Sequence, residues 1–351
     1  MNIFTLDVGA GTQDFFLYNP RENLRNCIKM VLPSPTKLVA HKVRRCTTSG
    51  EDILYTGFTM GGGPVTKAAK DHLGAGLNAY AEEKAALTFS DDVDKVRNMG
   101  IQLVDSARDV DAHQIELMDF DFKFYSRLLH EVGAGADVYV VAVQDHGFSP
   151  HESNRKFRFK KFEEIMSKSG YIHSFLFPSP QVPQYFNRMK SVSDSLEGRI
   201  EPENLFIIDT VFAAIAGCML DIKDFPALLI NLGNSHTVGA VVDRDGLIHS
   251  FFEHHTGILR GRGHDGVEKF INSFLKGEVS NEDVFNDGGH GAYIRDVVDV
   301  KDSAITGPNM HLSSRRVANP AGDVMVTGNL GMIKAYLGDE FDLNFFKSIW
   351  T

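Results

Sequence analysis

A glycine-rich turn flanked by apolar segments occurs twice in this chain and constrains the fold more than any other feature. The first turn lies in Asp7–Asp14, with the sequence DVGAGTQD, and the second in Asn231–Thr237, with the sequence NLGNSHT. Apolar runs precede and follow each turn, so each copy predicts a strand, a tight turn and a second strand. The two copies align at a constant spacing that places Asp7 on Asn231 and Gly9 on Gly233.

Turns of this composition are suited to binding phosphate. Glycine lets the backbone approach an anion closely and adopt positive φ, and successive N–H groups can line a concave anion site. A single turn usually only reverses the chain, but a purely structural turn has no reason to recur together with its strands. We therefore predict that two hairpin tips contact a polyphosphate from opposite sides. The predicted contacts are Asp7, Gly9, Gly11, Thr12 and Gln13 in the first copy and Asn231, Gly233, Asn234, Ser235 and His236 in the second.

Composition limits the classes of protein that fit. The 351 residues suffice for two domains with full cores. A formal net charge of −10 argues against nucleic-acid binding and against docking on an anionic membrane. The sequence shows no leader pattern or membrane span, and its three cysteines have no C-x-x-C spacing. We expect a cytoplasmic protein without nucleic-acid or membrane partners.

Periodicity predicts an α/β protein with several other elements. A small α/β unit is expected near 77–110, a strand over 172–177 and a helix over 260–275. Residues 324–326 read as a strand that leads into a glycine turn and a helix. Small residues over 213–217 predict that another helix packs closely against this segment.

Two further segments carry candidate ligand contacts. The apolar run over 137–143 reads as a buried strand, and Gln144, Asp145 and His146 follow at its carboxyl end, where α/β sheets place ligand contacts. Gly61, Gly62 and Gly63 precede a helix that begins at Pro64. They form either a second anion-binding turn at the helix N-terminus or a flexible loop, and the sequence favours neither.

The order of these motifs resembles the actin-like ATPase superfamily, which includes sugar kinases, actin and DnaK-type chaperones. The resemblance implies two ribonuclease-H-like domains, about 1–210 and 211–351, around a nucleotide cleft that binds ATP and Mg²⁺. In this resemblance Thr327-Gly328-Asn329, with Gly331, corresponds to the adenosine motif. Asp209-Thr210-Val211 is similar to the segment that supplies the catalytic base in hexokinases.

Two segments, Val143–Gly147 (VQDHG) and Asp287–Ala292 (DGGHGA), resemble one prokaryotic family within this superfamily. That family carries the label pyruvate formate-lyase activating enzyme. A radical activating enzyme of that kind needs a cluster motif of three cysteines. The three cysteines of this chain lie far apart, so we reject that activity and keep the family.

One position departs from the superfamily pattern. The second phosphate motif usually begins with an acidic residue that helps to hold Mg²⁺ through water, and here it begins with Asn231. Magnesium binding would then depend on Asp7 and Asp14. Asp209 is predicted to be the catalytic base, and it can at the same time be the N-cap of the helix that follows. Asp145 is held as a second candidate for the base.

Six of the fourteen histidines occupy suggestive positions: His146, His236, His254, His255, His264 and His290. None forms the His-x-x-x-His spacing that would specify a metal site on a helix. Structural or substrate-contacting histidines are the more usual outcome, and His146 and His255 join the three glycines at 61–63 as candidate substrate contacts.

These observations predict an ATP-binding protein that catalyses Mg²⁺-dependent phosphoryl transfer or ATP hydrolysis. The acceptor, a small molecule or a protein, is not specified by the sequence. Two alternatives stay open: a nucleotide-sensing regulatory module without efficient catalysis, and a metalloenzyme that uses the histidines.

Overall fold

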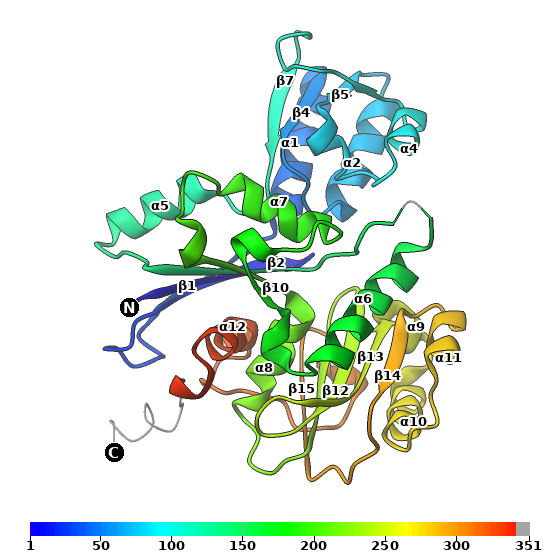
Figure 1. Ribbon diagram of the computed structural model, residues 1–351. Coiled ribbons are helices and arrows are strands. Elements are labelled where there is room, and N and C mark those ends of the chain that lie inside the picture. The colour runs from blue at the N-terminus through cyan, green and yellow to red at the C-terminus, as the bar shows by residue number, and fades with distance from the viewer. Residues whose placement is uncertain (150, 342–351) are drawn as a thin grey trace.

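The computed structural model describes residues 1–149 and 151–341 and contains three sheets (Figure 1). The first sheet has the strand order β3-β2-β1-β8-β10-β9. Its strands are β1 (Ile3–Val8), β2 (Thr12–Tyr18), β3 (Ile28–Pro33), β8 (Val138–Val143), β9 (Leu176–Pro178) and β10 (Leu205–Asp209). Strands β1 to β3 form an antiparallel meander, whereas β8 and β10 run parallel to β1.

The second sheet repeats this arrangement with the order β14-β13-β12-β11-β15. Its strands are β11 (Ala227–Leu232), β12 (His236–Val242), β13 (Ile248–His255), β14 (Gly291–Ile294) and β15 (Asp302–Thr306). Again the first three strands are antiparallel, and β15 runs parallel to β11 on its other side. An antiparallel meander whose first strand also pairs with a parallel strand is the ribonuclease-H-like pattern, and here it occurs twice.

A third, all-parallel sheet lies apart from the other two at the top of Figure 1, with the order β6-β5-β4-β7. It consists of β4 (Ile53–Gly57), β5 (Ala79–Ala81), β6 (Ile101–Leu103) and β7 (His113–Leu117), with helices α1 (Pro35–Ser49), α2 (Gly63–Gly74), α3 (Glu83–Ala86) and α4 (Val93–Asn98). These elements have an apolar core of their own, built around buried residues such as Val43, Tyr55 and Ile115. The segment 77–110 lies within this unit, which is inserted between β3 and β8.

Helices α8 (Thr210–Met219) and α12 (Thr327–Leu337) lie between the two larger sheets, as Figure 1 shows. A Cβ on Gly217 would overlap the carbonyl of Thr327, and one on Gly331 would overlap the carbonyl of Ala213. The two backbones therefore touch, and only glycine fits at either position. This contact confirms the close helix packing predicted for 213–217.

The remaining helices cover the sheets or connect them: α5 (Phe122–Glu131), α6 (Asn154–Lys168), α7 (Asn187–Ser195), α9 (Thr256–Gly261), α10 (Gly263–Leu275) and α11 (Asn281–Asn286). A single apolar core contains residues of both larger sheets, among them Phe4, Val141, Leu229 and Phe251. Within the described part of the chain, no helix is long and apolar enough to cross a membrane.

Three expected elements differ in the structure. The predicted strand over 172–177 is a 3₁₀ helix, Ile172–Phe175, followed by the short β9, because buried Phe175 stacks on Phe212 with ring centroids 3.5 Å apart. The predicted helix over 260–275 is two helices, separated where Gly263 adopts a φ of 67°.

The third difference lies near the end of the chain. Residues Val324–Val326 form a 3₁₀ turn instead of a strand, and Asp323 caps it by accepting from the backbone N–H of Met325 at 3.1 Å. The expected glycine turn that follows is the first part of α12. Periodicity cannot show whether a run of three apolar residues is a strand or a helical turn. Here the side-chain cap from Asp323 stabilises the 3₁₀ turn.

Candidate functional site

The two glycine turns are structurally equivalent. In the first, the N–H of Gly9 donates to the carbonyl of Thr12 at 2.9 Å, and in the second the N–H of Gly233 donates to the carbonyl of His236 at 3.0 Å. Strand pairing continues in the same register behind both turns, from Val8 opposite Gln13 and from Leu232 opposite Thr237. The alignment made from the sequence is therefore confirmed residue by residue.

Both turns line one cavity of about 350 Å³ between the two larger sheets. The tips face each other, since a Cβ on Gly11 would lie 3.0 Å from the side-chain nitrogen of Asn234. Half of the lining residues come from the predicted motifs, namely Asp7, Gly9, Gly11, Thr12, Asp14, Asn231, Gly233, Asn234, Ser235, His236, Thr327 and Gly328. The volume is within the range of small-molecule sites, which runs from about 300 to 1,000 Å³.

The turn glycines do not use positive φ, contrary to the prediction. At Gly233 the requirement is space, because a Cβ would lie 2.6 Å from the carbonyl oxygen of His236. At Gly9 the same atom would make an ordinary 3.4 Å contact with the carbonyl of Thr12. The first turn could therefore hold a larger residue at position 9 without strain of its own backbone.

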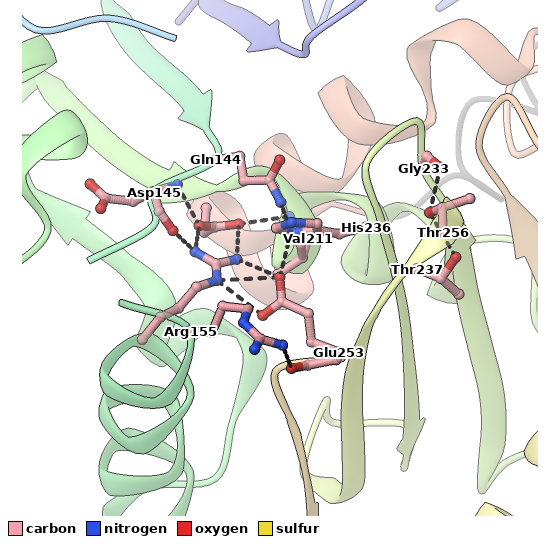
Figure 2. A network of polar contacts seen from close by, with 12 residues as sticks. Gln144, Asp145, Arg155, Val211, Gly233, His236, Thr237, Glu253 and Thr256 are labelled. Carbon is pink, nitrogen blue, oxygen red and sulfur yellow. Dashed lines mark hydrogen bonds and ion pairs between the residues drawn. The ribbon is translucent and has the colours of Figure 1, made fainter. Parts of the chain in front are cut away.

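Thr256, buried at the start of α9, holds the second turn in place. Its hydroxyl donates to the carbonyl of Gly233 at 2.8 Å and lies 3.0 Å from the hydroxyl of Thr237 (Figure 2). The second turn is thus tied to β12 and to α9, which fixes the position of its N–H groups before any ligand binds.

Asp7 and Asp14 face each other across the first hairpin, where they form a directly opposed pair. Burial raises the pKa of Asp7 well above its ordinary value, and the charges of Asp14 and Asp209 raise it further. Burial also raises the pKa of Asp14 to about 6. One oxygen of Asp14 has no hydrogen-bond partner among the described residues. Two opposed carboxylates, one of them with an unsatisfied oxygen, fit a divalent cation that takes oxygen ligands, as Mg²⁺ does.

Asp209, the predicted base, has a carboxylate that is fully engaged. It caps α8 by accepting from the N–H of Val211 at 3.1 Å and also accepts from the N–H of Asp145 at 3.0 Å. Arg158, which is buried on α6, approaches it to 2.7 Å. Asp209 is 2% exposed and is not among the residues that line the cavity. Its role as base stays a prediction, and its role as a helix cap is observed.

Arg158 connects the ends of two sheets. Besides Asp209 at the end of β10, it pairs with Glu253 on β13 at 3.0 Å. Burial alone would raise the pKa of Glu253, but the Arg158 guanidinium outweighs it, with help from His290 and His236, and holds that pKa well below its usual range. Glu253 in turn lies 2.8 Å from Nδ1 of His236, and Gln144 also contacts this nitrogen (Figure 2).

The carboxylate of Asp145, the second candidate for the base, is also engaged in hydrogen bonds within the fold. Its carboxylate accepts from the N–H groups of Gly147 at 2.7 Å and Met189 at 2.8 Å, and burial raises its pKa to about 6. Figure 2 shows Asp145 at the edge of the polar network. Like Asp209, it does not line the cavity.

Several other predicted residues lie outside the cavity. Gln13 donates to the carbonyl of Pro33 at 3.0 Å and accepts from Tyr125, so it fixes the hairpin to its neighbours. Asn329 is fully buried and donates to Thr5 and to the carbonyl of Asp14 at 2.8 Å. Gly331 lies at the close contact between α8 and α12 described above.

The glycines at 61–63 also lie away from the cavity lining. Gly61 packs against Arg188 and Gly62 against the carbonyl of Thr88, whereas Gly63 begins α2. His146 is exposed, with its ring centroid 5.6 Å from that of His236. His255 does not line the cavity but lies beside His236, with ring centroids 5.0 Å apart.

The structure adds residues that sequence reasoning missed. Lys37, in the first turn of α1, extends toward the cavity, and its ammonium group would be 4.0 Å from a Cβ on Gly11. Thr210 lines the cavity at the end of β10, and Gly307 lines it with a φ of 96°. Of these added residues, only Thr210 had a signal in the sequence, because it follows a buried strand. Gln144, a candidate from its place after β8, also lines the cavity.

Two ribonuclease-H-like sheets that present equivalent hairpin turns to a shared cleft define the actin-like ATPase fold. The chain belongs to the family whose model, described as "Putative pyruvate format-lyase activating enzyme (DUF1786)", matches residues 60–312. The three cysteines, Cys27, Cys46 and Cys218, are free and buried, the last two on α1 and α8. Among the described residues the three thiols form no common metal-binding group, whereas an iron–sulfur cluster needs several cysteine ligands at one site.

Solved structures resemble this one only distantly. A PPX-GPPA enzyme of Aquifex aeolicus matches with 10% identity and a TM-score of 0.33, over 88% of this chain and 69% of its own. An exopolyphosphatase of Cytophaga hutchinsonii matches with 10% identity and a TM-score of 0.31, over 88% of this chain and 67% of its own. No curated protein matches the chain. Similarity this weak supports no conclusion about activity.

Proposed function

We propose that the protein binds ATP in the cavity between the two turns and couples this binding to phosphoryl transfer or hydrolysis. The observation that carries the proposal is that two equivalent hairpin turns, far apart in sequence, line one cavity of about 350 Å³. In this proposal the backbone N–H groups near Gly9 and Gly233 bind phosphate oxygens from opposite sides. Lys37 adds a positive charge near Gly11, beside the first turn.

The nucleoside would occupy the other part of the cavity. Its lining includes the apolar side chains of Met310, Val324 and Met325, together with Thr327 and Gly328 at the start of α12. An adenine ring has apolar faces and a few polar edges, and such a mixed surface is typical of small-molecule sites.

Mg²⁺ would be held by Asp7 and Asp14, and Asn231 lines the same cavity from the second hairpin. In phosphoryl transfer the metal neutralises charge that develops on the phosphate oxygens. The carboxylates are preorganised for this task because the strand pairing places them opposite each other. Asp209 is the proposed base, with Asp145 in reserve, and Asp209 would have to exchange part of its pairing with Arg158 to contact a nucleophile.

A nucleotide-sensing module is the second candidate. It is favoured by the engaged carboxylate of Asp209, which accepts from two backbone N–H groups and pairs with a buried arginine. Asn231, an amide where related motifs have an acid, favours it as well. In that case ATP would bind and alter the contact between the two sheets without efficient turnover.

Thermal denaturation with and without Mg²⁺-ATP, combined with a phosphate-release assay, tests the proposal and separates the candidates. A ligand at one hundred times its Kd stabilises a protein by about 2.7 kcal/mol. A raised Tm with phosphate release supports the enzyme, whereas a raised Tm without release supports the sensing module. An unchanged Tm with millimolar ATP or ADP would rule out both the enzyme and the sensing module.

A further inference from the structure

Three histidines from three segments converge beside the second turn. His236 begins β12, His255 ends β13 directly opposite it, and His290 precedes β14. The ring centroid of His236 lies 5.0 Å from that of His255 and 4.5 Å from that of His290, and those of His255 and His290 are 5.0 Å apart. One nitrogen from each ring lies within 4.8 Å of the other two.

Hydrogen bonds engage one nitrogen of His236 but leave a buried nitrogen of His290 without a partner among the described residues. His236 is 6% exposed and His290 is 2% exposed, and Nδ1 of His290 has no partner among the described residues. A buried ring nitrogen without a hydrogen-bond partner is available to a bound ion.

A carboxylate orients the central ring. Glu253 lies 2.8 Å from Nδ1 of His236, which leaves Nε2 of that ring for another contact. Metal-binding histidines commonly donate their second nitrogen to a carboxylate in this way, which fixes the tautomer and strengthens the ligand. Glu253 is itself held at 3.0 Å by Arg158. The cluster thus has the outer support of a metal site.

We propose that His236, His255 and His290 bind one first-row transition metal ion of the zinc class. Three imidazoles suit Zn²⁺ and its neighbours, whereas Mg²⁺ requires oxygen ligands. Three protein ligands leave a fourth tetrahedral position for water or substrate, as in catalytic zinc sites. The site does not depend on nucleotide binding, and it is separate from the Asp7–Asp14 pair.

Two cavities border the cluster. His236 lines the cavity between the turns, and His290 lines a second cavity of about 540 Å³ between α6 and α11. In a zinc site the three ring nitrogens would lie about 2.0–2.1 Å from the ion. A metal here would lie directly behind the second turn, where it contributes positive charge.

Calorimetric titration of the chelator-treated protein with Zn²⁺ alone and with Co²⁺ alone tests this site. We expect one ion per chain, and for Co²⁺ the visible absorption of a tetrahedral complex with nitrogen ligands. His255→Gln, at a half-buried position, should weaken binding by more than the roughly 10–100-fold typical of lost outer-shell contacts. His290→Gln should do the same.

Two other histidines provide matched controls. His264 is exposed on α10, and His254 contacts Asp287 at 2.7 Å without joining the cluster. His264→Gln and His254→Gln should bind Zn²⁺ as the unchanged protein does. The proposal is overturned if the unchanged protein binds no stoichiometric ion, or if a folded His255→Gln protein keeps the same affinity and the same Co²⁺ spectrum.

Discussion

Lys37 is an exposed lysine at the edge of the cavity, without an ion pair among the described residues. A positive charge near Gly11 should favour a polyphosphate, since charge-assisted contacts are roughly twice as strong as neutral ones. We predict that Lys37→Met weakens ATP binding about tenfold, equivalent to about 1.4 kcal/mol. Lys42→Met, on the same helix but outside the cavity, is the control. Equal affinities in both variants would show that Lys37 does not contact the nucleotide.

The opposed pair of Asp7 and Asp14 gives a prediction about pH. Because the folded pKa of Asp14 is about 6, above the unfolded value of about 3.9, the folded state binds the proton more tightly. The stability contributed by this group is therefore present below about pH 4 and is lost as the pH rises through 6. Mg²⁺ should reverse the loss, so its effect on Tm should be larger at pH 7.5 than at pH 5.

Asp14→Asn separates this interpretation from a general effect of pH. The amide removes one of two like charges that face each other across a strand pair. We expect the variant to be more stable than the unchanged protein at pH 7.5 in the absence of metal, and insensitive to Mg²⁺. If Mg²⁺ raises both Tm values equally, the metal binds elsewhere.

Among the elements, the two hairpins differ in what their glycines do for the fold. A Cβ at position 233 would meet the carbonyl of His236 at 2.6 Å, whereas one at position 9 would have an ordinary contact. We predict that Gly233→Ala lowers the free energy of unfolding by at least about 1 kcal/mol. Gly9→Ala should leave it nearly unchanged. Chemical denaturation of both variants measures the difference, and equal losses would contradict it.

The hairpins could be predicted from sequence because their determinants are local. Strand, turn and strand follow one another within 16 residues in each copy. The repeated pattern set the alignment. The end of the chain was harder to predict, since Asp323 caps a 3₁₀ turn where three apolar residues resembled a strand. Phe175 likewise belongs to a 3₁₀ helix instead of the expected strand. It stacks on Phe212, and this contact is made only in the folded protein.

Contacts between distant segments explain what the sequence did not reveal about the site. Arg158 lies far along the chain from Asp209 and from Glu253, and no local pattern connects the three. Lys37 reaches the cavity only because α1 begins beside the first turn. The three clustered histidines are brought together by strand register, so spacing rules for a single helix could not find them.

For the molecule as a whole, the buried network of Asp209, Arg158 and Glu253 joins the ends of the two larger sheets. Removing one partner of a buried ion pair typically costs about 3–5 kcal/mol, since the other charge stays buried. We predict that Asp209→Asn lowers the free energy of unfolding by an amount in that range, measured by urea denaturation. An effect on phosphate release without a loss of stability would instead identify Asp209 as the base.

The central claim is that the two turns close on one nucleotide, and calorimetric titration with Mg²⁺-ATP tests it most directly. The protein should bind one ATP per chain. Gly9→Val should lose most of that affinity while keeping its Tm, because the added side chain occupies space meant for phosphate. Absence of heat with the unchanged protein at millimolar ATP, or full affinity in folded Gly9→Val, would contradict the account.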